Sequence, residues 1–115
     1  LPFNVHMADA FTSAHHEDPE SGEAVSALEF AHREGLSVFA SAALMGGELT
    51  AGLPEDISAE LAGDSPAQRA INFARSAPAV ASALVGMGRP SHVREDLAAG
   101  TFDPLGASAF DAVFE

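Results

Sequence analysis

Three short apolar runs divide the chain, and more polar segments lie between them. The runs cover residues 1–5, 36–40 and 80–85. Each is almost continuously apolar instead of alternating with polar residues, which is typical of strands that are covered on both faces in a parallel sheet. The pattern therefore predicts three parallel strands, and Pro2 favours a strand start or a sheet edge for the first of them.

Apolar residues at helical spacings fill the segments between and after the predicted strands. This spacing predicts helices over residues 24–34, 65–77, 90–99 and 107–114. Ser65 or Asp64 can cap the second of these helices, with Pro66 near its first position. Because strands and helices alternate as in right-handed βαβ units, the sequence predicts an α/β fold with parallel strands and a C-terminal helical tail.

Two long segments interrupt this alternation and are predicted to be flexible loops. They lie near residues 7–21 and 42–63, and the second has room for a short helix near 55–61. Each follows a predicted strand, and loops at the carboxyl ends of parallel strands are where α/β proteins hold their ligands. At this length, residues 1–115 are expected to form a single domain or a part of one.

The charge of the chain argues against several classes of partner. The sequence has 17 Asp and Glu residues, no lysine and 5 basic residues, all arginine, for a formal net charge of -12. Such a surface repels nucleic-acid phosphates and anionic membranes, so neither partner is expected. No apolar run approaches the ~20 residues that span a bilayer. The absence of cysteine is compatible with a reducing, cytoplasmic location, which is the location we expect.

Two features suggest ligand chemistry, and each also has a plainer explanation. The loop with Gly86 and Gly88 joins a strand to a helix N-terminus, which is a natural anion site, but it also fits an ordinary turn. His15 and His16 stand next to acidic residues, as metal ligands can. A third fixed ligand is missing from that segment, so a solvated loop is expected there and no metal site.

The ordered set of segments resembles the C-terminal part of an aldo/keto reductase, a (β/α)8 TIM barrel that uses NADPH. Residues 1–4 resemble its sixth strand, 27–41 its sixth helix and seventh strand, 65–68 the start of its seventh helix, and 85–97 its eighth strand and cofactor helix. The resemblance covers nearly the whole chain. It implies a partial TIM barrel with about three βα units, and the lack of an initiator methionine fits an expectation that the chain begins within a longer protein.

The resemblance also implies contacts with the adenosine end of NADP. Gly86, Met87 and Gly88 would approach the 2′-phosphate and the adenosine through their backbone amides. His92 falls where the family often has an arginine that grips the 2′-phosphate, and Arg89 is a nearby alternative cation.

Further contacts are implied for the adenine, the pyrophosphate and the nicotinamide. Glu95 and Asp96 match a Glu–Asn pair that contacts adenine, with Asp in place of Asn, so the amide donor is lost. Leu44 and Gly46 would lie along the pyrophosphate. Ser41 sits where many members carry an aromatic side chain that stacks on the nicotinamide.

The catalytic residues of that family are not in this chain. The family reduces carbonyls with a Tyr proton donor supported by Lys, Asp and His, and this sequence contains no tyrosine and no lysine. The resemblance therefore implies the NADP-binding portion of an oxidoreductase that, when complete, takes NADPH and a small carbonyl substrate. A truncated, non-catalytic relative that acts as a binding or scaffold partner, and an α/β binding module unrelated to redox chemistry, remain alternatives.

Three parallel strands cannot cover all of their own surface. They leave two sheet edges and one inner face open, and open edges pair readily with other chains. We therefore expect the chain to self-associate or to pair with the missing N-terminal half of a barrel.

Overall fold

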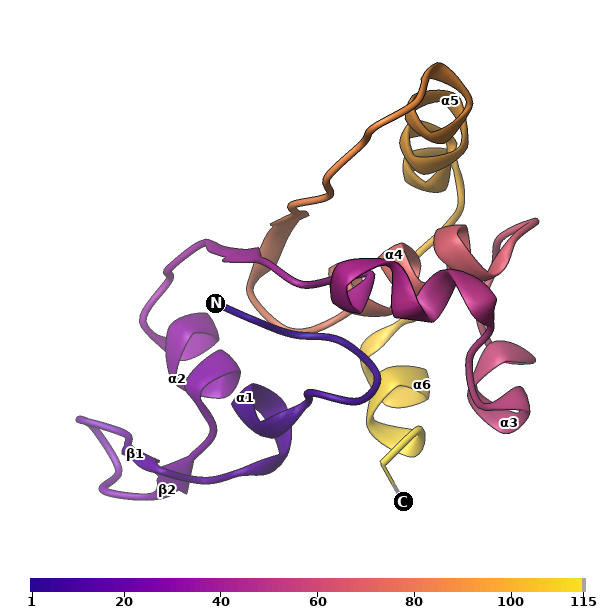
Figure 1. The fold of residues 1–115 in the computed structure, drawn as a ribbon. Coiled ribbons are helices and arrows are strands. Elements are labelled where there is room, and N and C mark those ends of the chain that lie inside the picture. The colour runs from indigo at the N-terminus through magenta and orange to yellow at the C-terminus, as the bar shows by residue number, and fades with distance from the viewer. Residues whose placement is uncertain (115) are drawn as a thin grey trace.

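A short parallel sheet forms from the three apolar runs (Figure 1). Strand β3 (Val38–Ala40) pairs in parallel with β4 (Val80–Ala83), with Ala40 opposite Ala83. The N-terminal segment lies along the other side of β3, because Phe3 N–H donates to Ser41 O at 3.0 Å and Ser41 N–H donates to Leu1 O at 2.8 Å. The prediction of an α/β fold with parallel strands is therefore confirmed. This computed structural model describes residues 1–114, and within them the sheet does not close into a barrel.

Only one face of this sheet is covered, so the prediction of strands buried on both faces is wrong. Phe3 and Ala40 are fully buried and belong to the hydrophobic core. On the opposite face, Phe39 is 57% exposed and Leu84 is 52% exposed. The physical reason is that helix α4 (Pro66–Arg75) packs beneath the sheet and contributes Phe73 to the core, while nothing within residues 1–114 covers Phe39.

The predicted helices form, but most are shorter than their apolar spacing indicates. They are α2 (Ala27–Arg33), α4, α5 (Pro90–Ala98) and α6 (Ala107–Ala112). At α4, Ser65 Oγ accepts a hydrogen bond from Gln68 N–H at 3.2 Å, and Pro66 is in the first turn, as predicted. At α2, Ser26 caps the helix, and the two residues before it belong to a strand.

The two segments predicted as loops contain short elements. Residues 7–21 hold α1 (Asp9–Thr12) and β1 (His16–Glu17), and β1 pairs in antiparallel fashion with β2 (Ala24–Val25). Residues 42–63 hold the 3₁₀ helix η1 (Met45–Ala51) and α3 (Glu55–Ser58). A second 3₁₀ turn, η2 (Ala99–Thr101), continues α5. None of the helices within residues 1–114 has the length and apolar character that crossing a membrane requires.

Phenylalanine rings join the two ends of the chain in the core. Phe3 stacks on Phe73 with ring centroids 5.6 Å apart and an interplanar angle of 7°. Phe110 on α6 lies 5.4 Å from Phe73 and 4.9 Å from Phe11, and it is 1% exposed. Close aromatic pairs of this kind add to the free energy gained from apolar burial. The N-terminal segment and α6 are therefore held against the same helix, α4.

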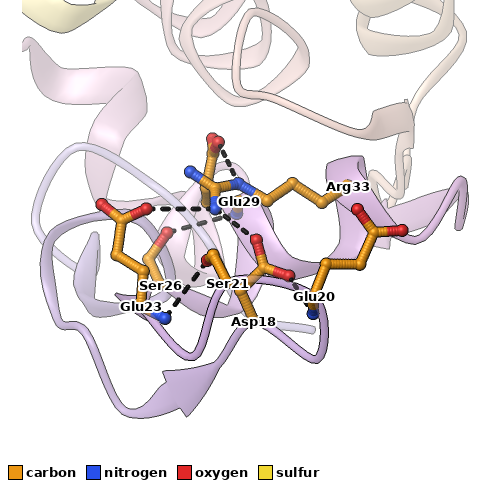
Figure 2. Close-up of polar contacts among 7 residues, drawn as sticks. All are labelled: Asp18, Glu20, Ser21, Glu23, Ser26, Glu29 and Arg33. Atoms are coloured by element: carbon orange, nitrogen blue, oxygen red, sulfur yellow. Dashed lines mark hydrogen bonds and ion pairs between the residues drawn. The ribbon is translucent and has the colours of Figure 1, made fainter.

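The β1–β2 hairpin is fastened to α2 by one arginine (Figure 2). Arg33 Nη1 pairs with Asp18 and lies 3.3 Å from a carboxylate oxygen of Glu23, and Arg33 Nε donates to Glu29 at 3.0 Å. Asp18 is buried although it is charged, and Glu20 N–H also donates to it at 2.9 Å. The Glu20 N–H and then Arg33 hold the pKa of this carboxyl below its usual 3.8.

Replacing Arg33 is expected to loosen this hairpin. In Arg33→Ala, the carboxylates of Asp18, Glu23 and Glu29 lose their shared cation, so the amides of Asp18 and Gly22 should exchange with deuterium faster than in the wild type. Arg94→Ala is the control, because the Arg94 side chain makes no hydrogen bond or ion pair with another residue in the described part of the chain. Unchanged protection in Arg33→Ala would show that the turn hydrogen bonds suffice without the arginine.

The same contacts predict an acid dependence of the hairpin. The pKa of Asp18 is lower in the folded chain than in the unfolded chain, so its stabilising contribution is complete above the unfolded value. That contribution is lost as the pH falls below about 4 and through the lower, folded value. Amide exchange in residues 16–25, corrected for intrinsic rates, should therefore rise below about pH 4, and a flat profile down to pH 2 would contradict the assignment.

The open sheet face is expected to make the chain associate. Sedimentation velocity should show species larger than a monomer, and Phe39→Ser should shift the distribution toward monomer because it removes an exposed aromatic side chain from that face. Leu97→Ser is the matched control, because Leu97 is 65% exposed but lies on α5, away from the sheet. A monodisperse wild-type monomer that melts cooperatively would refute the prediction.

Candidate functional site

A cavity of about 410 Å³ lies at the carboxyl ends of β3 and β4. Its walls are the loop after β3, the end of β4, the start of α4 and one side of α5. Most of the residues with implied cofactor contacts line it, namely Leu44, Gly46, Gly86, His92, Glu95 and Asp96. Its volume is in the range of small-molecule sites. Segments that are far apart in the sequence thus meet at one hollow.

Met87, Gly88 and Arg89 line a separate hollow of about 460 Å³ together with Arg94, and this hollow is shallow and wide open to solvent. This hollow lies at the start of α5, and Arg89 is the residue that precedes the helix. Ser41 lines neither hollow. Its backbone is engaged in the pairing of the N-terminal segment with β3.

The loop after β3 has an unusual backbone. Gly46 and Gly47 have φ angles of 66° and 93°, in the left-handed region that favours glycine. Ala42 and Met45 also have positive φ, of 57° and 52°, where a Cβ causes strain. Strained residues of this kind are often found at binding sites, where the surrounding structure holds them in place.

The glycines after β4 are not required by the fold. Neither Gly86 nor Gly88 has a positive φ, and a Cβ added at either would meet no atom within 4 Å. The backbone therefore does not need glycine here, and neither does the packing of residues 1–114. What the missing side chains provide is open space in which another molecule can approach the backbone closely.

Helix α4 positions the α5 wall of the cavity. Gln68 Nε2 donates to the carbonyl oxygen of Glu95 at 3.0 Å, and Gln68 Oε1 accepts from Asp64 N–H at 2.7 Å. Gln68 is itself buried, so both ends of its amide are satisfied inside the protein. The helix that carries Glu95 and Asp96 is therefore fixed relative to the sheet.

Asp96 is the electrostatically unusual group of the cavity. It is only 7% exposed, and no residue of the described chain donates a hydrogen bond to its carboxylate. Burial raises the pKa of Asp96 above its usual 3.8, the negative charge of Glu95 raises it further, and His92 opposes the shift. A ligand that supplied donors or positive charge would stabilise this carboxylate.

The arginines divide into those that hold the fold and those that do not. Arg33 binds carboxylates, Arg69 donates to Gly63 O at 3.1 Å, and Arg75 donates to Phe102 O at 2.7 Å. In the part of the chain that the structure describes, Arg89 and Arg94 have no such partner, and they line one hollow. Sequence reasoning identified Arg89 but missed Arg94. Arg94 is recognised once the side chains of Arg33, Arg69 and Arg75 are known to have structural partners, which leaves Arg89 and Arg94.

Three of the four histidines in the N-terminal half gather at another cavity, of about 400 Å³. His15 and His16 line it with His6 and Asp9. Nevertheless, no group of three or more His, Cys, Asp or Glu residues within residues 1–114 is arranged to hold a metal ion. This cavity therefore offers imidazole groups but no metal-ligand set.

Comparison with known proteins adds no relative: no family model matches the chain, and no curated protein matches it with significance.

Removing the charge of Asp96 is expected to stabilise the protein at neutral pH. A carboxyl with a raised pKa binds protons more readily in the folded state, so stability falls as the pH rises through that pKa. Asp96→Asn should therefore melt at a higher temperature than the wild type at pH 7, and the difference should shrink as the pH approaches 4. Melting curves between pH 4 and 8 measure this. A variant that is less stable than the wild type at pH 7 would show that the carboxylate has a stabilising partner.

Proposed function

We propose that this chain is the NADP-binding portion of an aldo/keto reductase-like oxidoreductase, with its strands forming part of a (β/α)8 barrel. The observation that carries the proposal is the cavity at the carboxyl ends of β3 and β4, because residues assigned to cofactor contacts from sequence resemblance line it together. In α/β proteins this end of the sheet is where ligands bind.

The residues of the two hollows fit the parts of NADP. Leu44 and Gly46 would lie along the pyrophosphate, and the open backbone at Gly86 and Gly88 leaves room for close approach. Arg89 and Arg94 would take the 2′-phosphate, because they are the arginines without structural partners in residues 1–114 and no carboxylate lines their hollow. Arginine binds phosphate oxygens with charge-assisted hydrogen bonds.

This assignment changes the proposed phosphate ligand from His92 to the arginines. His92 lines the cavity at the carboxyl ends of β3 and β4 together with Glu95 and Asp96, whose charges oppose a nearby phosphate. Arg94 lines the other hollow with Arg89. Two permanent cations in a hollow free of carboxylates suit a phosphate better than one imidazole between two acids.

The proposed role is cofactor binding, without the complete reaction. NADPH supplies a hydride when it is bound, and reduction of a carbonyl also needs a proton donor for the nascent alkoxide. The sequence has neither the tyrosine nor the lysine that the family uses. The residues named here would orient the cofactor, and the proton would come from another segment of polypeptide.

A non-catalytic scaffold is the second candidate, and the open sheet face favours it. Phe39 and Leu84 expose apolar surface on the face that α4 does not cover. A truncated relative could use such a face to bind another protein, with or without NADP. The binding experiment below separates the two candidates.

Isothermal titration calorimetry is expected to show weak binding of NADP and weaker binding of NAD. Arg89→Gln/Arg94→Gln should weaken NADP binding by about tenfold or more and leave NAD binding unchanged, since the two dinucleotides differ only in the 2′-phosphate. Arg89→Lys/Arg94→Lys is the control, because it keeps both charges. Undetectable or equal binding of the two dinucleotides by the wild type would refute the proposal and favour the scaffold.

A further inference from the structure

The histidine-lined cavity beside the N-terminal segment shares no residue with the proposed cofactor site. It has a volume of about 400 Å³ and is partly open to solvent. Its wall combines three histidines, one serine and one aspartate with five apolar residues, which are Leu1, Pro2, Met7, Ala10 and Ala27. An apolar wall with a few polar groups is typical of small-molecule sites of this size. The cavity is therefore a candidate ligand site that is independent of the proposed function.

The three imidazole rings at this cavity are not used by the fold. They belong to His6, His15 and His16, and in residues 1–114 none of these rings makes a hydrogen bond or an ion pair with another protein group. An imidazole offers one donor and one acceptor when it is neutral, and two donors when it is protonated. This hydrogen-bonding capacity is therefore left for solvent or for a ligand.

Contacts within the fold hold opposite walls of the cavity in place. Asn4 is fully buried, and its side-chain oxygen accepts from His6 N–H at 2.8 Å and from Met7 N–H at 2.9 Å. On the other wall, His16 belongs to β1, and its ring lies against Phe30 with ring centroids 5.7 Å apart. The histidines are thus gathered before any ligand arrives, which reduces the cost of ordering them on binding.

The charged groups at the cavity favour an anionic ligand. Within residues 1–114, Asp9 on α1 is the one carboxylate that lines it, because Glu17 does not, although it follows His16 directly. The amino group of Leu1 donates to Phe39 O at 2.9 Å. Histidine side chains gain positive charge as the pH falls from about 8 to about 5. Three imidazoles then outnumber one carboxylate, so the cavity becomes a positive site on a negative chain.

We infer that this cavity binds small organic acids, molecules with a carboxylate and a compact apolar or aromatic body. The imidazoles of His6, His15 and His16 donate to the carboxylate, and the apolar residues of the wall cover the body. Hydrogen bonds between charged partners are stronger than those between neutral groups, so binding tightens as the imidazoles gain protons. The apolar wall makes an acid with a ring a better ligand than an acid without one.

Titration of the full chain with benzoate, followed by NMR of the imidazole C–H groups, tests the inference. At pH 6, benzoate should shift the resonances of His6, His15 and His16 and leave that of His32, which does not line the cavity, in place. The affinity should fall by about tenfold between pH 6 and pH 8, because benzoate stays charged while the imidazoles lose their charge. Acetate has the carboxylate without the ring and should bind at least about tenfold more weakly.

The variant His6→Gln/His15→Gln/His16→Gln should bind benzoate about tenfold or more weakly than the wild type at pH 6, because glutamine stays neutral. His32→Gln is the matched control, since it removes an exposed histidine of α2 from outside the cavity, and it should keep the wild-type affinity. Undetectable binding, equal affinities for benzoate and acetate, or equal shifts at all four histidines would overturn the inference. These wild-type measurements decide the question even if the triple variant folds poorly.

Discussion

The arrangement of this chain depends on the burial of one helix, α4. Its Phe73 packs beneath the sheet, and its polar residues Gln68 and Asn72 are buried as well. Buried amides must find hydrogen-bond partners, and here other segments of the chain supply them. Asn72 donates to Ala62 O at 3.2 Å and to Asp103 O at 3.0 Å. Gln68 donates to the backbone of α5. The hydrogen bonds of these two buried amides therefore fix the positions of the loop before α4, of helix α5 in the cavity wall and of the C-terminal segment.

The scarcity of cations explains how the charges are distributed. With 17 acidic residues and 5 arginines, any arginine without a structural contact is conspicuous. Arg33 neutralises the carboxylates of the hairpin, and Arg75 binds carbonyl oxygens next to η2. Arg89 and Arg94 have no such partner in residues 1–114, and their hollow contains no acid. Because the other arginines are bound within the fold, Arg89 and Arg94 form a small positive region on a strongly negative chain.

Much of the fold follows from local patterns, and the remainder depends on contacts that local patterns do not encode. The apolar runs predicted the parallel strands, and Ser65 with Pro66 predicted the start of α4, because these signals are local. Ala24 and Val25 fit a helical spacing equally well, yet they pair with β1 across a turn. The apolar run around Phe39 predicted a strand covered on both faces, because such a run does not reveal whether a second layer exists; the open face was expected only from the small number of strands. At the site, six of the ten residues to which the resemblance assigns cofactor contacts line one cavity, whereas Arg94 required knowledge of which arginines are already used.

A net charge of -12 would be expected to repel the proposed anionic ligand, but this repulsion weakens with the distance between the carboxylates and the ligand. At 0.15 M ionic strength, charges separated by more than ~8 Å are largely screened, so most of the carboxylates act weakly on a bound phosphate. Contacts within hydrogen-bond range decide, and at the start of α5 these come from Arg89, Arg94 and an open glycine backbone. The cavity at the carboxyl ends of β3 and β4 has the opposite character, because Glu95 and Asp96 line it. The two hollows therefore differ in charge: cations line the one at the start of α5, and carboxylates line the one at the carboxyl ends of β3 and β4.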